Sequence, residues 1–257
     1  MSFLQPTFGI QPGPGLRGPA MGSLAIILLA ACLLRPDTQV TAAEAQDLST
    51  TVQLTGQVTM TGKPIPPKRI QVTKDADHCH PADLPLVRLG KQGALADVVI
   101  EFRRVKAPSA GWNWPEPPAG GYHLHQHDCG FTPYLLVMPD GTELTVTNDD
   151  PVAHNVNTGS WNIMQPAGAP PIIRKLSGRQ PIRVGCNIHS WMEAWVYTVK
   201  SPLYAVTGLD GHYTIKNIPP GKYRATAWHP YLGWQRFRVN IQASKIMVHD
   251  LQYDSPE

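Results

Sequence analysis

Proline and glycine are so frequent in this chain that they leave little room for long helices. The 257 residues include 26 prolines and 22 glycines, and these separate short runs rich in Val, Ile, Thr and Tyr. Proline lacks the backbone donor that a helix interior or a central strand needs, and glycine adopts turn conformations easily. Short β-prone runs between turn residues are typical of sandwiches and barrels. The sequence therefore predicts an all-β protein.

The expected strands form two groups along the chain. We expect one β-sandwich domain over residues 46–200 and a small β-meander domain over residues 201–257, which is marginal as an independent core. Residues 52–72 are expected to lend strands to this second domain. Residues 106–121, rich in Pro, Gly and Trp, are expected to form a loop. Strands are expected at 52–58, 69–73, 94–104, 134–138, 143–148, 181–186 and 193–200.

The N-terminal segment has the pattern of a secretory signal. Leu24–Leu34 is the only uninterrupted apolar run, Arg17 precedes it, and it is shorter than the about 20 residues of a membrane span. Residues 1–45 are therefore expected to be signal peptide and linker, and the mature protein to reach the periplasm or cell envelope. Cys32 ends a Leu-Ala-Ala-Cys sequence that resembles a bacterial lipobox. Lipidation of Cys32 and an incidental cysteine both remain open.

The charge of the chain does not favour a nucleic-acid partner. The net charge of +3 arises from 22 basic and 19 acidic residues spread along the sequence, as expected for a solvated surface. Contact with a membrane is expected only through the candidate lipid anchor. The sequence names no redox partner protein.

The cysteine count separates one thiol from the others. With Cys32 in the leader, Cys79, Cys129 and Cys186 remain in an exported chain, where disulfides persist. Three is an odd number, so one thiol stays unpaired. Cys79 and Cys129 lie in polar, turn-like surroundings, whereas Cys186 begins a Cys-x-x-His-x-x-Met sequence. We expect a Cys79–Cys129 disulfide and a free Cys186.

Four residues together match the donors that copper takes in electron-transfer proteins. Cys186, His189 and Met192 lie at three-residue intervals in one predicted loop, and His154 follows an earlier predicted strand. Two imidazoles and a thiolate with a weak axial thioether suit both oxidation states of copper. Each residue alone has a commoner explanation: a turn histidine, a buried structural thiol or core filler. In this order and between strands, the four favour a metal site.

The same segment resembles the cupredoxin family. Ala153-His154-Asn155-Val156 is similar to the Pro-His-Asn-Val of plastocyanin and amicyanin, and the ligand loop has the amicyanin spacing. The resemblance implies a Greek-key β-sandwich and a side-chain bond from Asn155 to the ligand loop. It also implies that His154 and Cys186 are buried equatorial ligands, Met192 is the axial ligand, and His189 lies at the solvent-facing edge as the electron port.

The wider chain, over residues 50 to 252, resembles a two-domain exported family of the methylamine-utilisation-like type. The resemblance rests on residues 62–67, Lys74 to Cys79, Trp191-Met192 and Ala205 to Tyr223. It implies that the second domain is a carboxypeptidase-regulatory-like, transthyretin-like β-sandwich. The chain departs from the family at Tyr134, where related chains often carry histidine, and in its expanded loop at 106–121.

A second group of histidines is a weaker candidate for metal binding. His123, His125 and His127 alternate along a predicted strand, so their side chains are expected on one face. His78 and His80 flank Cys79, and the expected disulfide would bring all five histidines near one another. An accessory copper or zinc site and an exposed polar strand beside a disulfide both remain open, and the exposed strand is the preferred interpretation.

These patterns predict an exported protein with one type 1 copper ion that transfers electrons and catalyses no reaction. Copper carriage or storage, with added capacity from the histidine group, is the first alternative. The second is a non-metal envelope module that binds through the C-terminal β domain. The sequence contains no nucleophile-elbow serine, phosphate loop or paired catalytic carboxylates.

Overall fold

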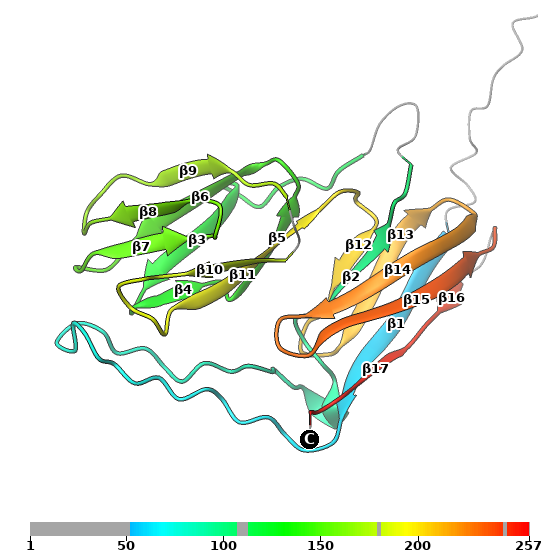
Figure 1. The fold of residues 1–257 in the computed structure, drawn as a ribbon. Coiled ribbons are helices and arrows are strands. Elements are labelled where there is room, and N and C mark those ends of the chain that lie inside the picture. The colour runs from blue at the N-terminus through cyan, green and yellow to red at the C-terminus, as the bar shows by residue number, and fades with distance from the viewer. Residues whose placement is uncertain (1–51, 107–112, 179–180, 244–245, 257) are drawn as a thin grey trace, which may run out of the picture. The chain divides into compact units, whose positions relative to one another are not determined.

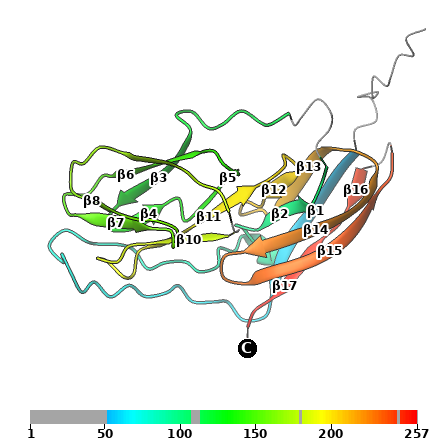
Figure 2. The ribbon, with the colours of Figure 1, turned by 45° about the horizontal axis from the view of Figure 1, so that its top comes forward.

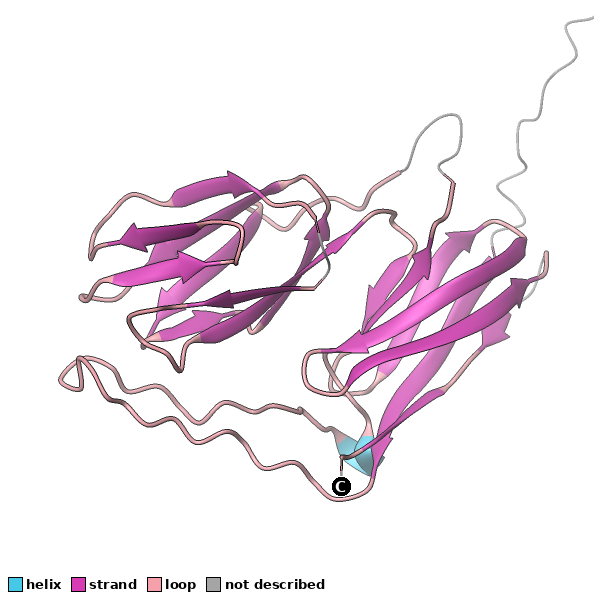
Figure 3. Ribbon diagram, viewed as in Figure 1, coloured by secondary structure: helices cyan, strands magenta, loops and turns pink. Residues whose placement is uncertain are grey.

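The computed structural model describes residues 52–256 except 107–112, 179–180 and 244–245. Within these ranges the protein is all-β, as the sequence predicts, and the one helical element is the short 3-10 turn η2 (Lys91–Gly93) (Figure 3). The expected signal segment and Cys32 lie outside the described residues. The described part of the chain has no helix with the length and apolar character that a bilayer crossing requires.

The strands belong to four sheets. In chain order they are β1 (Val52–Thr61), β2 (Val99–Arg103), β3 (Tyr122–His127), β4 (Gly130–Thr132), β5 (Leu135–Pro139), β6 (Glu143–Asn148), β7 (His154–Asn157), β8 (Asn162–Gln165), β9 (Ile172–Lys175), β10 (Ile182–Gly185), β11 (Glu193–Val199), β12 (Tyr204–Val206), β13 (His212–Ile218), β14 (Gly221–His229), β15 (Gly233–Ile241), β16 (Ile246–Val248) and β17 (Leu251–Asp254).

Strands β3 to β11 form one two-sheet unit, here called the central sandwich (Figure 1). One sheet has the order β5-β11-β10-β7-β8 and the other β4-β3-β6-β9. Their alternating apolar residues meet in one core: Leu144 and Val146 of β6, for example, are fully buried while their neighbours face outward. Strand β11 is buried over most of its length, because Val196 packs into this core and Tyr197 into a second cluster with Val99 and Trp228.

The remaining strands form a second unit, here called the terminal sandwich (Figure 1). In one sheet β1 pairs with β13, β16 and β17, and in the other the order is β12-β2-β14-β15. β1 therefore pairs with strands from the C-terminal part of the chain. β2 does so as well, pairing with β12 and β14, although the expected boundary placed it in the first domain. Sequence order misled here because strand pairing joins segments far apart in the chain.

Residues 62–90, here called the arm, differ from the sequence prediction. The strand expected at 69–73 is not formed, and a single bridge between Lys68 and Leu84 joins the two limbs of the arm. Figure 1 and Figure 2 show the arm as two extended limbs that leave the terminal sandwich after β1 and return before β2. Prolines at 64, 66, 67, 81 and 85 remove backbone donors and so prevent a regular ladder.

The turn from β14 to β15 contains a buried neutral histidine that makes stability depend on pH. His229 is 1% exposed, and its Nδ1 accepts the N–H groups of Tyr231 and Leu232 at 3.1 and 3.2 Å. Burial lowers the pKa of His229 to about 4. In the unfolded chain a histidine titrates near about 6.5, so the unfolded state binds the extra proton between these two pH values.

We expect this histidine to contribute full stability above pH 6.5 and to lose its contribution as the pH falls toward 4. The free energy of unfolding should drop by roughly 3 kcal/mol across that window from His229 alone. His229→Asn retains a side-chain acceptor for the turn but has no titrating ring. The free energy of unfolding of this variant should therefore fall less between pH 7 and 4.5 than that of the wild-type protein. Urea unfolding at both pH values measures this, and equal losses in the two proteins would exclude the assignment.

Candidate metal centre

The loop between β10 and β11 carries three of the predicted ligands. β10 and β11 are antiparallel and aligned up to the pair Gly185 and Glu193, so residues 186–192 form the connection at the tip of a hairpin. His154 is the first residue of β7, which pairs with β10 where Asn157 lies opposite Gly185. Because β7 and β10 are neighbours, His154 and the hairpin loop lie at the same end of the sheet.

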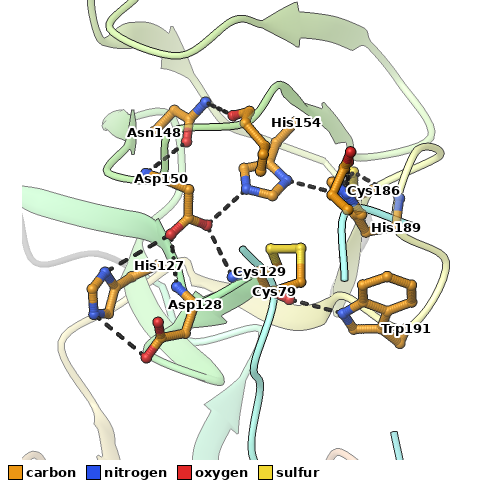
Figure 4. Close-up of a disulfide and its surroundings, with 12 residues drawn as sticks. Cys79, His127, Asp128, Cys129, Asn148, Asp150, His154, Cys186, His189 and Trp191 are labelled. Carbon is orange, nitrogen blue, oxygen red and sulfur yellow. Dashed lines mark hydrogen bonds and ion pairs between the residues drawn. A yellow bond between two sulfur atoms is a disulfide. The ribbon is translucent and has the colours of Figure 1, made fainter. Parts of the chain in front are cut away.

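Three of the four predicted ligands converge in the core of the central sandwich. His154, Cys186 and His189 each place one donor atom within 4.8 Å of the others (Figure 4). The two Nδ1 atoms are 2.8 Å apart, and the Cys186 sulfur is 3.9 Å from the His189 Nδ1. Both histidines are fully buried and Cys186 is 5% exposed. Two imidazoles and one free thiol therefore face one another in a site shielded from water.

The other nitrogen of each imidazole is held by a carboxylate. His154 Nε2 lies 2.8 Å from Asp150 Oδ2, and His189 Nε2 lies 2.7 Å from Asp75 Oδ2. An ionised carboxylate can only accept, so each Nε2 carries a hydrogen, and in a neutral ring the Nδ1 then keeps its lone pair. The two lone pairs then face each other beside the thiol. Such an arrangement is repulsive unless a proton or a cation lies between them, and outer carboxylates of this kind are usual behind metal-bound histidines.

The donor spacing is close to what a small cation needs. With bond lengths of about 2.0 Å to nitrogen and 2.3 Å to sulfur, a trigonal site separates two nitrogens by about 3.5 Å and nitrogen from sulfur by about 3.7 Å. The observed nitrogen–sulfur distance of 3.9 Å is near this value. The two nitrogens, at 2.8 Å, would have to separate by roughly 0.7 Å. The residues present fit a soft transition metal with a small adjustment of two side chains.

The protonation of His154 also suits a ligand. Burial lowers the pKa of His154 from its usual 6.5, against the opposing effect of its bond to Asp150. The ring is therefore neutral at pH 7. A neutral imidazole can donate its lone pair to a metal, whereas a protonated one cannot.

Backbone and side-chain bonds position the thiol. The N–H groups of Asn155 and His189 both donate to the Cys186 sulfur, at 3.4 Å each, and hold it in place. The Asn155 side chain contacts the ligand loop, as the resemblance implied, because its Oδ1 accepts the N–H of Asn187. The Asn155 amide donates in turn to Asn162 on β8. These bonds fix the loop against β7.

Met192 lies at the end of the same loop and is 1% exposed. Its backbone N–H donates to the carbonyl of His189 at 3.0 Å and closes the loop as a turn. Its side chain belongs to the core cluster that includes Cys186 and Trp191. The axial role of Met192 stays a prediction.

The arm covers the side of the site where the sequence predicts an electron port. His189 is fully buried rather than solvent-facing, because Asp75 of the arm bonds to its outer nitrogen and Trp191 lies beside its ring. The expected disulfide between Cys79 and Cys129 is present and ties the arm to the central sandwich. Both of its sulfurs lie within 4.8 Å of a His189 nitrogen (Figure 4). The expectation of an exposed His189 edge is therefore wrong.

The site approaches solvent on its cysteine side instead. Cys186 and Met192 line a cavity of about 740 Å³, together with Asn157, Arg183 and Ser190. Cys186 is the one free cysteine among the described residues. Because it lines this cavity, the cavity leads to a free thiol. This cavity therefore offers a route from solvent to the donor cluster on the side of Cys186.

The second histidine group is only partly assembled. β3 places His123, His125 and His127 on one face, as predicted, with Leu124 and Gln126 buried between them. His123 and His125 stack with ring centres 5.9 Å apart. Among the described residues, the one donor group that includes any of these five histidines joins His127 with Asp128 and Asp150. His78 and His80 are exposed and belong to no such group.

Sequence reasoning missed the two carboxylates. Asp150 had a local signal, since it lies four residues before His154 in the same turn, where it also accepts the N–H groups of Asp128 and Cys129. Asp75 had none, because it is 114 residues from His189 in sequence. Its position depends on the arm and on the disulfide four residues later.

The fold and the site define an all-β protein with a buried two-histidine, one-cysteine donor cluster. No known family model matches the chain, and no curated protein matches its sequence. Solved structures that are similar include a purple cupredoxin from Nitrosopumilus maritimus, at 20% identity over 30% of this chain and 98% of that one, with a TM-score of 0.26. Amicyanin from Paracoccus versutus matches at 15% identity over 38% of this chain and 96% of that one, with a TM-score of 0.28.

A copper-containing nitrite reductase from Thermus scotoductus matches at 17% identity, over 37% of this chain and 25% of the reductase, with a TM-score of 0.28. All three similarities are too low to assign a site or an activity. The chemistry of the centre is therefore inferred from its own donors and their surroundings.

Proposed function

We propose that the chain is an exported copper protein that holds one copper ion through His154, Cys186 and His189, with Met192 as a weak axial ligand, and that it transfers electrons. The observation that carries this proposal is the pair of Nε2–carboxylate bonds, which turn both Nδ1 lone pairs toward the thiol. Two imidazoles and a thiolate are the donor set that suits both oxidation states of copper, which supplies one-electron redox chemistry.

The protein's own contribution is to hold these donors in place and keep water away. Asp150 and Asp75 fix the two rings, the N–H groups of Asn155 and His189 fix the sulfur, and the core excludes solvent. A site whose ligands are held by their neighbours changes little between two oxidation states, which favours an electron carrier over a catalyst. The disulfide agrees with export to the periplasm or cell envelope, where such bonds persist.

Exchanging the carboxylate behind His189 tests this proposal. Asp75→Asn keeps the size of the side chain but removes the charge that holds the Nε2 hydrogen, so copper affinity should fall by about 10- to 100-fold. Asp77→Asn is the matched control, since Asp77 is an exposed residue of the same arm. Competition with a chelator of known affinity measures both. Equal affinities in the two variants would show that Asp75 does not support a metal ligand.

Copper carriage is the second candidate, and one observation favours it. The donor group His127, Asp128 and Asp150 shares Asp150 with the buried cluster, since Asp150 Oδ2 bonds to His154 while its Oδ1 lies 4.0 Å from His127 Nδ1. A carrier would take up a second ion there. Native mass spectrometry of the copper-loaded protein separates the candidates: one ion per chain supports electron transfer, and a second ion that is lost in His127→Ala supports carriage.

A further inference from the structure

An unusual row of arginines crosses one sheet of the terminal sandwich. Arg224 on β14 lies directly opposite Arg103 on β2 and directly opposite Arg238 on β15. Residues directly opposite one another in antiparallel strands project from the same face. Arg236, two residues before Arg238, shares that face, and Arg104 follows the end of β2. Three adjacent strands thus bring five guanidinium groups to one region.

This arrangement is unfavourable unless negative charge is supplied. Neighbouring strands are about 4.8 Å apart, and like charges directly opposite each other destabilise a sheet. Arg103 is paired with the buried carboxylate of Glu101 at 2.7 Å, which also accepts from Tyr197 and Lys200. Within the described part of the chain, no carboxylate forms an ion pair with the other four, which are all exposed: Arg104, Arg224, Arg236 and Arg238.

Protection of a sheet edge explains only part of the row. β15 is the last strand of its sheet, and charged side chains on an edge strand discourage pairing with other chains. This accounts for Arg236 and Arg238. It does not account for Arg103 and Arg224, because β2 and β14 are interior strands, each paired on both sides.

The five arginines line a single cavity of about 510 Å³, with Thr226 among its other lining residues. This volume lies within the usual range for small-ligand sites, about 300 to 1,000 Å³. The guanidinium group presents a planar fork of donors that matches a carboxylate or a phosphate group with two hydrogen bonds. One carboxylate can be satisfied by one arginine, so the four arginines that form no ion pair within the described residues indicate a ligand with several oxyanion groups close together.

We propose that this cavity, here called the arginine cavity, binds a ligand that carries two or more phosphate-type groups. A row of three strands spans roughly 10 Å, which is wide enough for two adjacent phosphoryl groups and their oxygens to meet separate guanidinium groups. Such a ligand is either a soluble polyphosphorylated molecule or an anionic phospholipid headgroup at a membrane surface. The site is separate from the candidate metal centre and does not depend on copper.

Calorimetric titration of metal-free protein with inorganic pyrophosphate tests the proposal. We expect saturable binding of one pyrophosphate per chain, at least tenfold tighter than orthophosphate, and weaker at high salt. Arg224→Gln/Arg238→Gln should weaken it at least tenfold. The matched control is Arg69→Gln/Arg174→Gln, which removes the same charge from two exposed arginines outside the cavity and should leave binding unchanged. Thermal unfolding shows whether each variant is folded.

Sedimentation with phosphatidylglycerol-containing vesicles, against phosphatidylcholine alone, distinguishes the two sources of phosphate. Binding of pyrophosphate without vesicles supports a soluble ligand, and binding of anionic vesicles that the Arg224/Arg238 variant loses supports a headgroup. The proposal is overturned if neither probe binds, as would be the case for a site that takes an acidic protein partner. It is also overturned if the control variant loses binding as much as the cavity variant does.

Discussion

Replacing Cys186 with serine is expected to abolish the intense visible absorption of the copper(II)-loaded protein. That absorption arises from charge transfer between a thiolate and copper, and Cys186 is the one free cysteine among the described residues. A serine side chain has almost the same shape, but its oxygen does not give the low-energy charge transfer to copper that a thiolate sulfur gives. The sulfur also accepts two backbone N–H groups, so serine leaves the loop bonds in place and removes only the donor.

The comparison with Met192→Ala makes this result specific. Met192 is a buried core residue whose proposed bond to copper is weak, so its loss should shift the absorption band and leave its intensity within about twofold. Absorption and electron paramagnetic resonance spectra of the three proteins, loaded with one equivalent of copper(II), measure the effect. An intense band that persists in Cys186→Ser would mean that copper is bound elsewhere.

Removing the Cys79–Cys129 disulfide is expected to cost about 4 kcal/mol of stability. The bond joins residues 50 apart, and closing a loop of that length restricts the unfolded chain by about this amount. Both sulfurs are almost fully buried, so Cys79→Ala/Cys129→Ala avoids placing a hydroxyl in the core. The double variant should also weaken copper binding, because the disulfide holds the part of the arm that brings Asp75 to His189.

A reductant provides the control for this prediction. Urea unfolding of the metal-free protein should show a lower midpoint when dithiothreitol is added to the wild-type chain. The double alanine variant should already have that lower midpoint and should not respond to the reductant. A stability loss below about 1 kcal/mol would show that the arm is held mainly by contacts other than the disulfide.

The sequence predicted those parts of the protein whose causes are local. β6 begins and ends at Glu143 and Asn148, as expected, because apolar and polar residues alternate strictly between two turns. The hairpin around the ligand loop was also predicted, because two β-prone segments flank the Cys-x-x-His-x-x-Met sequence directly in the chain. The disulfide was predicted from the odd cysteine count of a chain expected to be exported, together with the polar, turn-like surroundings of Cys79 and Cys129.

The features that the sequence did not predict depend on contacts between distant segments. β2 pairs with β14, about half the chain away, and nothing in its own residues marks that partner. His189 is buried because the arm returns to it, and an extended, proline-rich arm has no periodic pattern from which its path can be read. The sequence likewise did not show which group bonds to the Nε2 atom of each imidazole. That bond decides that Nδ1 is the nitrogen left for a metal.

X-ray absorption at the copper edge reports the atoms bound to the metal and therefore tests whether copper is held by His154, Cys186 and His189. For the protein loaded with one equivalent of copper, we expect one sulfur and two imidazole nitrogens in the nearest shell, and the sulfur should be absent in Cys186→Ser. A nearest shell of nitrogen and oxygen alone in the wild-type protein would contradict it, and would assign copper to the exposed histidines instead of His154, Cys186 and His189.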